Sequence, residues 1–148
     1  MRYIHIGGET SFLSIKRKRV KNMKKKIANL TDSEELVMKS VWDTGKEPVL
    51  SDVVDRVNSA YGKDWRPQTV STFLAKLVAK KYLKLQRNGK IYTYKILITE
   101  DAYKQKLYQH HINFWNHNSM SEFVTEMFDN GDLTKEDWEE LTKKIDEL

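Results

Sequence analysis

The chain has 148 residues, contains no cysteine and carries a formal net charge of +5 at pH 7. Without cysteine it can form neither disulfides nor thiolate zinc sites, and thiol catalysis is excluded. No apolar run reaches the roughly 18 residues that a membrane span needs, and the N-terminal residues lack the apolar core of a secretory signal. We therefore expect a cytoplasmic protein without a membrane partner, built from one domain and a smaller appended unit.

Charge is distributed unevenly along the chain. Residues 1–28 contain nine basic residues and one acidic residue, and residues 29–98 contain twelve basic and eight acidic residues. Residues 99–148 contain five basic and twelve acidic residues. This separation favours a basic part that meets a polyanion and an acidic part with another role, over a solvated surface that is merely uneven.

Residues 1–28 show no sustained apolar periodicity, and basic clusters occupy positions 16–19 and 24–26. We expect a flexible basic arm here. Two interpretations remain open: an upstream extension with the true start at Met23, or an arm that contacts DNA.

The first ordered element is predicted to be a helix that begins after Thr31. Thr31 can cap this helix while the Glu34 side chain bonds back to the Thr31 amide, which is a capping box. Val37 and Val41 then form an apolar pair at helical spacing, and Gly45 ends the helix.

A second helix is expected after a short extended segment. Residues 48–50 are predicted to form an edge strand, and Ser51 is predicted to cap the helix that follows. Its apolar stripe includes Val53 and Val57, and Gly62 ends it.

The most informative segment is residues 65–98, which contain eight Lys and Arg residues and no Asp or Glu. Pro67 suits the first position of a third helix, because the missing N–H has no helical partner there. Apolar residues at helical spacing then predict a stripe that faces the core, formed by Val70, Phe73, Leu74, Leu77 and Val78.

The opposite face of this third helix is short, polar and free of acidic residues. An ordinary solvated face would mix Glu with Lys, because such pairs stabilise exposed helices. Their absence favours a helix that enters the major groove of DNA, where Gln and Thr can bond to base edges. We therefore predict base contacts by Gln68, Thr69, Ser71 and Thr72.

Two strand-like segments, 82–87 and 90–95, flank Asn88-Gly89, the preferred pair of a type I′ turn. Leu85, Ile91, Tyr92 and the other apolar residues of this hairpin are expected to pack on the helices. A helix followed at once by a basic hairpin is typical of a winged helix-turn-helix, whose hairpin holds phosphates. The predicted phosphate contacts are Arg66, Lys76, Lys84, Arg87 and Lys90.

Three short helices are predicted after residue 98, with caps at Thr99 and Thr134 and a break at Gly131. Roughly 50 residues cannot bury the large aromatic side chains there among themselves, because small units bury little of their surface. We predict a two-fold homodimer, with packing onto the winged helix of the same chain as the alternative. The predicted dimer interface consists of Phe114, Trp115, Phe123, Met127, Phe128, Trp138, Leu141 and Ile145.

No sequence pattern indicates catalysis, because the chain lacks a glycine-rich phosphate loop, H-E-x-x-H and G-x-S-x-G. His110 and His117 share a helical face but lie about 10 Å apart, too far for one metal ion without other ligands. We expect no enzymatic activity, no cofactor and no metal site.

Three segments resemble the penicillinase-repressor family of winged-helix repressors, which also includes the copper-responsive repressors. They read L-T-D-S-E-E-L-V-M-K-S-V-W at 30–42, D-W-R-P-Q-T-V-S-T-F-L-A-K-L-V-A-K-K-Y-L at 64–83, and G-K-I-Y-T-Y at 89–94. The resemblance covers about residues 23–148 and is looser after Thr99.

This resemblance agrees with the fold class expected from the residues, which is mainly α with a small β-hairpin. It implies a winged helix-turn-helix DNA-binding domain over residues 29–98 and a C-terminal helical dimerisation domain over residues 99–148. It also implies a homodimeric transcriptional repressor that binds double-stranded DNA at inverted repeats containing ACA/TGT.

Two departures from the family pattern bear on regulation. Copper-responsive members carry a cysteine-rich metal motif, which this chain lacks. A regulatory protease is the partner implied for β-lactam-responsive members, but Glu126-Met127 stands where they have the Asn-Phe pair that is cut. In addition, Arg66 replaces the small capping residue that usually precedes Pro67.

One rival function belongs to another class. In this alternative, the chain is a winged-helix protein-interaction adaptor that acts through its aromatic C-terminal helices. Such a protein would need no salt-sensitive binding to DNA.

Overall fold

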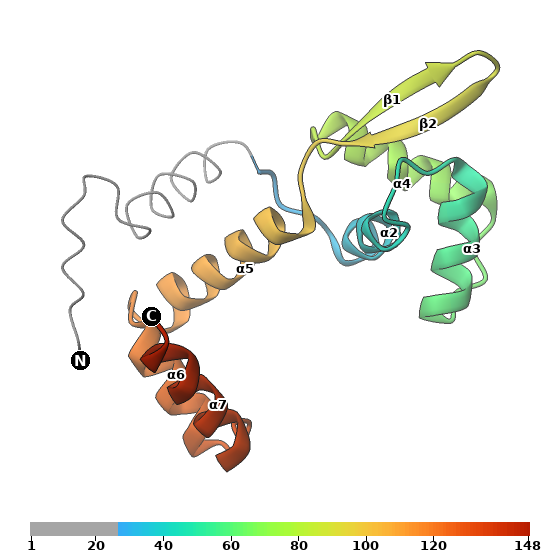
Figure 1. Ribbon diagram of the computed structural model, residues 1–148. Helices are drawn as coiled ribbons and strands as arrows, with labels where there is room; N and C mark the ends of the chain where they lie inside the picture. Colours follow the sequence, from blue (N-terminus) through green and yellow to red (C-terminus); the bar gives the residue numbers. More distant parts are fainter. Residues whose placement is uncertain (1–26) are drawn as a thin grey trace. The chain divides into compact units, whose positions relative to one another are not determined.

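The computed structural model describes residues 27–148 (Figure 1). The predicted basic arm therefore lies outside the described residues, apart from its last two positions. Within the described part, no helix has the length and apolar character needed to cross a membrane. The elements are α2 (Asp32–Asp43), α3 (Leu50–Tyr61), α4 (Pro67–Ala79), β1 (Leu83–Asn88), β2 (Ile91–Ile96), α5 (Glu100–Trp115), α6 (Met120–Asp129) and α7 (Lys135–Asp146).

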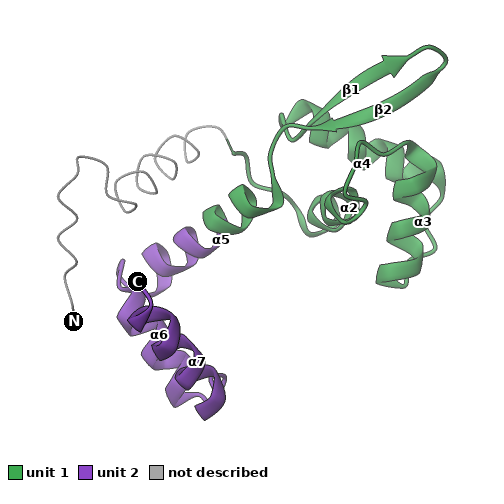
Figure 2. Ribbon diagram, viewed as in Figure 1, with its two compact units in different colours: residues 1–106 green, residues 107–148 purple. Residues whose placement is uncertain are grey.

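The predicted fold class is confirmed, since the described chain is mainly helical with one two-stranded antiparallel hairpin. The chain divides into two compact units, one up to Lys106 and one from Leu107 (Figure 2). The first unit thus continues past residue 98, where the sequence suggested a boundary. The physical reason is Tyr103 of α5, whose side chain is buried in the core of the first unit.

The core of the first unit is built from apolar side chains of α2, α3, α4 and the start of the hairpin. Their spacing of three or four residues puts them on one face of each helix, as predicted. Full burial of such a side chain stabilises the fold by about 1.5–3 kcal/mol. The fully buried members are Val37, Met38, Val41, Val53, Val57, Val70, Leu74, Leu77, Tyr82 and Leu83.

The predicted capping box at the start of α2 is confirmed. Thr31 Oγ1 accepts a hydrogen bond from the Glu34 amide at 3.3 Å, and Glu34 Oε2 accepts one from the Thr31 amide at 3.0 Å. Just before it, Ile27 and Ala28 pack against the core, and the Tyr82 hydroxyl donates to the Ala28 carbonyl. These two residues therefore belong to the folded unit and not to an arm.

The predictions for the start of α3 were wrong. Residues 48–50 form no strand, because α3 already begins at Leu50 and only the Pro48 carbonyl reaches β2, where it accepts from the Tyr94 amide at 3.0 Å. Ser51 lies inside the helix, whose N-cap is Val49. Valine offers no side-chain acceptor, and the Asp52 carboxylate instead accepts from the Val49 amide at 3.1 Å.

The hairpin forms, but its turn lies one residue later than predicted. Asn88 pairs with Ile91, so the two turn residues are Gly89 and Lys90. Only Gly89 has a positive φ, of 66°. A positive φ at the first turn position alone is the pattern of a type II′ turn, which prefers glycine there, and not of type I′. The resulting two-residue shift in pairing leaves every side chain on the face predicted for it.

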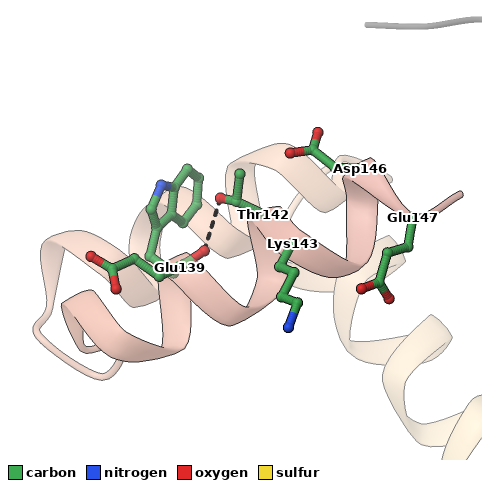
Figure 3. A pocket seen from close by; sticks show the side chains of 6 residues that line it. Glu139, Thr142, Lys143, Asp146 and Glu147 are labelled. Carbon is green, nitrogen blue, oxygen red and sulfur yellow. Dashed lines mark hydrogen bonds between the residues drawn. The ribbon is translucent and has the colours of Figure 1, made fainter.

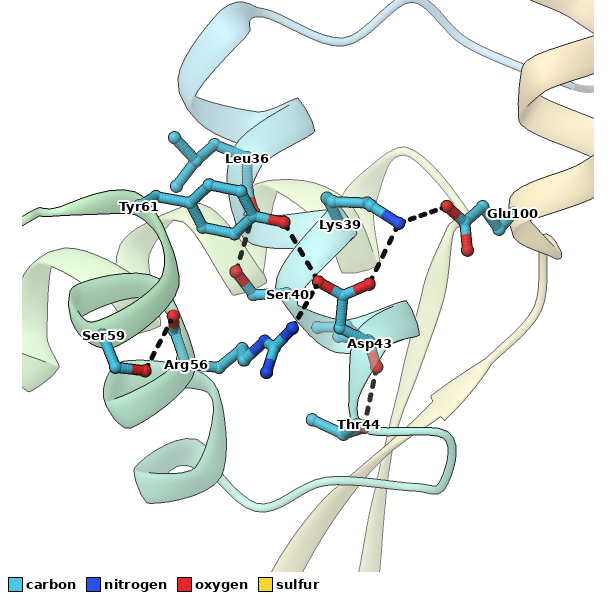
Figure 4. Close-up of polar contacts among 10 residues, drawn as sticks. Leu36, Lys39, Ser40, Asp43, Thr44, Arg56, Ser59, Tyr61 and Glu100 are labelled. Atoms are coloured by element: carbon cyan, nitrogen blue, oxygen red, sulfur yellow. Dashed lines mark hydrogen bonds and ion pairs between the residues drawn. The ribbon is translucent and has the colours of Figure 1, made fainter.

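A polar network joins α2, α3 and the first turn of α5 within the first unit (Figure 4). The Asp43 carboxylate accepts hydrogen bonds from Tyr61 at 3.0 Å and Arg56 at 3.3 Å, and its other oxygen lies 3.0 Å from Lys39 Nζ. Lys39 also pairs with Glu100. Burial by itself raises the pKa of Asp43, but the bonds from Lys39 and Tyr61 outweigh it and hold that pKa below its ordinary value.

The second unit buries very little in a single chain. Helices α6 and α7 have no buried residue, and among residues 107–148 only Ile112 and Asn116 are buried. A shallow groove along α7 is lined by residues of that helix and its C-cap: Trp138, Glu139, Thr142, Lys143, Asp146 and Glu147 (Figure 3). Ligand sites enclose most of their ligand, so this open groove offers none.

Candidate nucleic-acid interface

Helix α4 presents two different faces. Val70, Leu74 and Leu77 are fully buried and hold the helix against the core. The opposite face carries the predicted base-reading residues, of which three are exposed and Ser71 is half-buried: Gln68, Thr69, Ser71 and Thr72. The structure therefore leaves this polar face open to a partner.

The Thr72 hydroxyl already uses its proton in a hydrogen bond within α4. It donates to the Gln68 carbonyl at 2.9 Å. Since a hydroxyl has one proton, its oxygen remains available as an acceptor. In a major groove it could accept from the amino group of adenine or cytosine, and the Thr72 methyl could contact the methyl of thymine.

The five predicted phosphate-contacting cations are all exposed: Arg66, Lys76, Lys84, Arg87 and Lys90. None of them takes part in an ion pair among residues 27–148. Lys76 Nζ lies 5.3 Å from the centre of the Phe73 ring. This cation–π contact attracts the ammonium to the ring but leaves its positive charge in place. These cations are available to a polyanion.

The hairpin adds a cation that the sequence did not single out. Lys84 of β1 is paired directly with Lys95 of β2. Like charges in this position repel each other, and an anion between or beside them would relieve the repulsion. The cross-strand pairing of Lys95 with Lys84 could have identified Lys95 as a candidate phosphate contact. Predicting that pairing from the sequence requires the correct hairpin register.

The tip of the hairpin is more open than expected. Tyr94 is buried as predicted, whereas Leu85, Ile91 and Tyr92 are 46%, 58% and 51% exposed and do not pack on the helices. Tyr92 instead pairs across the strands with Arg87, whose guanidinium lies 5.7 Å from the centre of its ring. The outer part of the hairpin extends beyond the helices (Figure 1). The alternation of apolar and polar residues along a strand therefore could not predict which of these side chains are buried.

Not every cation of the acid-free segment is free. Lys80 Nζ donates to Glu34 Oε2 at 2.5 Å and to the Asn29 carbonyl at 2.8 Å, so it ties the end of α4 to the start of α2. Burial raises the pKa of Glu34, but the bonds from Lys80 and Thr31 outweigh this, and the pKa lies below its ordinary value. Lys80 therefore has a structural role.

In the second unit, the predicted dimer residues form an aromatic and aliphatic surface. Phe123 and Met127 are half-buried, and the other six are exposed: Phe114, Trp115, Phe128, Trp138, Leu141 and Ile145. Phe114 and Trp115 contact each other edge to face with ring centres 4.8 Å apart, and Phe128 and Trp138 lie 5.8 Å apart. Exposed clusters of large apolar side chains are typical of interaction sites.

The histidines of α5 contact aromatic rings. His110 stacks on Phe114, and His111 meets Phe123 edge to face. Among residues 27–148 no cluster of three metal-binding side chains was found.

Comparison with known proteins gives a consistent result. The sequence profile described as "Penicillinase repressor" matches residues 30–147. The penicillinase repressor of Bacillus licheniformis is 25% identical over 123 residues, which cover 83% of this chain and 94% of that protein. The methicillin resistance regulatory protein MecI of Staphylococcus aureus (strain N315) is 25% identical over 119 residues, which cover 80% and 94%.

Two solved structures are among those to which this chain is similar. The solution structure of monomeric Bacillus licheniformis BlaI in complex with the blaP half-operator is 28% identical, covers 53% of this chain and 92% of that chain, and has a TM-score of 0.44. The crystal structure of MepR, a transcription regulator of the Staphylococcus aureus efflux pump MepA, is 14% identical, covers 92% and 91%, and has a TM-score of 0.45.

Proposed function

This chain belongs to the penicillinase repressor family, and on this premise we propose that it is a homodimeric transcriptional repressor that binds an inverted-repeat operator in double-stranded DNA. The observation that carries the proposal is the surface of α4 and the hairpin. That surface is exposed, residues 65–98 contain no acidic residue, and its five predicted phosphate contacts form no ion pair among the described residues.

The two kinds of side chain on this surface divide the work of recognition. Arg66, Lys76 and the hairpin cations bind phosphates, which sets the position of the domain but reads no sequence. Gln68, Thr69 and Thr72 of α4 contact base edges in the major groove, because their short polar side chains allow close approach. Ser71 is half-buried and contributes at the edge of this face.

The second unit supplies the two-fold symmetry. Since α6 and α7 bury no residue within one chain, pairing with a second copy covers the surface formed by Phe128, Trp138 and their neighbours. Two copies of α4 then enter successive major grooves, so the half-sites lie about 34–36 Å, or a small multiple of this, apart.

Release of the repressor from DNA by proteolysis would involve the second unit and not the proposed DNA-binding surface. The bond between Glu126 and Met127 lies inside α6, and Glu126 Oε2 accepts from Asn116 Nδ2 at 2.7 Å. A protease acting there would have to open this part of the helix first.

The test is fluorescence-anisotropy titration of the full chain with two labelled duplexes. One duplex contains an inverted repeat of ACA/TGT, the operator class that the family implies, and the other contains the same bases in scrambled order. Each titration is repeated over a salt series, because the slope of log K against log salt counts the phosphates that are contacted.

Tighter binding to the repeat with a steep salt slope is the expected result. Selection from a random duplex library would identify the operator if it differs from ACA/TGT. Weak, equal binding to every duplex would reject the repressor and favour the protein-interaction adaptor.

A further inference from the structure

The first turn of α4 has a favourable proline at its first position but no side-chain cap. Its N-cap is Arg66, which makes no side-chain capping bond, and Pro67 at the first position has no N–H. Gln68 and Thr69, two of the proposed base-reading residues, lie in this turn. Val70, Leu74 and Leu77 hold the body of α4 against the core, so the residues just before Arg66 are where this first turn can receive additional support.

Asn58 of α3 holds the residue immediately before that cap. Its amide Nδ2 donates to the Trp65 carbonyl at 3.0 Å, and its Oδ1 accepts from the Trp65 amide at 2.9 Å. The side chain thus satisfies both backbone groups of one residue, as a neighbouring strand would. Two bonds at one residue restrict rotation as well as translation of the backbone.

The Trp65 side chain makes a second link, in this case to α4 itself. Its indole stacks on the ring of Phe73 with centres 5.3 Å apart and planes inclined by 28°. Phe73 lies one turn beyond Thr69 and next to Thr72. A stacked aromatic pair contributes about 0.5–1.5 kcal/mol beyond the area that it buries.

We propose that Asn58 and Trp65 are positioning residues for base recognition: by clamping the backbone before α4 and stacking on Phe73, they set the direction in which Gln68, Thr69 and Thr72 point. This inference rests on the proposed function, because it assumes that α4 reads DNA. Neither residue needs to touch a base. Asn58 is half-buried behind the turn, on a helix that carries no proposed contact.

Base recognition and phosphate binding respond differently to a loose helix start. A hydrogen bond to a base edge weakens steeply with a poor angle, whereas attraction of a cation to phosphate falls slowly with distance. Loss of the clamp should therefore reduce the preference for the operator and leave binding to random DNA nearly unchanged.

The main experiment compares Asn58→Ala with Ser59→Ala. Ser59 is the next residue of α3, is exposed, and has one long hydrogen bond to the Arg56 carbonyl at 3.5 Å (Figure 4), so it is a matched control. Alanine favours a helix more than asparagine does, so α3 should persist. The probes are the duplex that the wild-type chain selects from a random library and an unselected duplex of equal length.

We expect Asn58→Ala to lower the ratio of the two affinities about tenfold, which corresponds to roughly one base contact. Ser59→Ala should leave this ratio unchanged. Hydrogen exchange at the Trp65 amide should accelerate in Asn58→Ala, because that amide loses its acceptor.

The stacking link is tested separately, since Asn58 bonds to the backbone of Trp65 and not to its ring. Trp65→Ala should lower the affinity ratio, and Trp65→Phe, which keeps a ring on Phe73, should restore most of it. This pair of variants also provides the test if Asn58→Ala proves too unstable to assay.

An equal fall in both affinities would mean that the clamp serves stability alone, and two unchanged affinities in both Asn58→Ala and Trp65→Ala would mean that it positions nothing. Either result overturns the inference while the wild-type chain still selects its operator. A wild-type chain that selects no sequence would instead reject the proposed function, and the inference with it.

Discussion

At the scale of single residues, Thr72 lies at the centre of the proposed base-reading face. Because Thr72 is exposed and its hydroxyl oxygen can still accept a hydrogen bond, Thr72→Ala should weaken binding to the selected operator by roughly 1–3 kcal/mol and change binding to random DNA little. Titration of both duplexes by anisotropy measures this. Thr72→Val keeps a methyl group and separates the two contributions. Equal losses on both duplexes would rule out base reading by Thr72.

Lys76 and Arg87 should behave differently from Thr72, because phosphates carry no sequence information. Lys76→Ala and Arg87→Ala are each expected to weaken binding to all duplexes alike and to reduce the salt slope by about one unit. Lys80→Ala is the contrasting variant, since Lys80 is bonded to Glu34 and Asn29. It should lower the stability of the fold and leave the slope intact. A slope that does not change in Lys76→Ala would remove that residue from the phosphate contacts.

At the scale of elements, two carboxylates join helices within the first unit. Glu34 connects α2 to the end of α4 through Lys80, and Asp43 connects α2 to α3 through Arg56 and Tyr61. The pKa of each carboxyl lies below its ordinary value, which is 4.5 for Glu34 and 3.8 for Asp43. The folded state therefore binds these protons less readily than the unfolded state does.

This difference sets the direction of the acid dependence. Their contribution to stability should be fully present above these ordinary values and should be lost as the pH falls through the lower folded-state values. Urea unfolding between about pH 7 and pH 3 measures the effect. Glu34→Gln cannot titrate, so its stability should depend less on pH over the acid range. The same pH dependence in Glu34→Gln and wild type would assign the acid sensitivity to other groups.

At the scale of the whole molecule, the proposed dimer depends on the second unit, whose helices α6 and α7 bury no residue within one chain. Trp138→Ala and Phe128→Ala should shift the protein toward monomer in sedimentation equilibrium and weaken operator binding, because two linked half-sites bind more tightly than one. Glu139→Gln, an exposed neighbour on α7, serves as the control. A dimer of unchanged stability in both alanine variants would place the interface elsewhere.

Local patterns predicted the helices well, because a cap or an apolar stripe depends on residues only three or four positions apart. The capping boxes at Thr31 and Thr134 and the cap at Thr99 are examples. The start of α3 was mispredicted for a local reason: the helix begins at Leu50 with Val49 as its N-cap, and the Asp52 carboxylate accepts from the Val49 amide, so no cap from Ser51 is used. The hairpin turn failed because Asn88-Gly89 and Gly89-Lys90 are both acceptable turn pairs, and pairing along the whole strand decides between them.

The sequence by itself determined that this is a mainly helical, winged-helix member of its family, with an acid-free polar face on α4 and a basic hairpin that follows α4 along the chain. Those features follow from residue type and spacing along a short stretch of chain. Only the tertiary structure decided that Lys80 is bonded internally, that Lys84 faces Lys95, that Tyr103 extends the first core, and that Asn58 clamps Trp65. The first, third and fourth of these depend on how separate elements pack within the whole unit, and the second depends on the register of the whole hairpin.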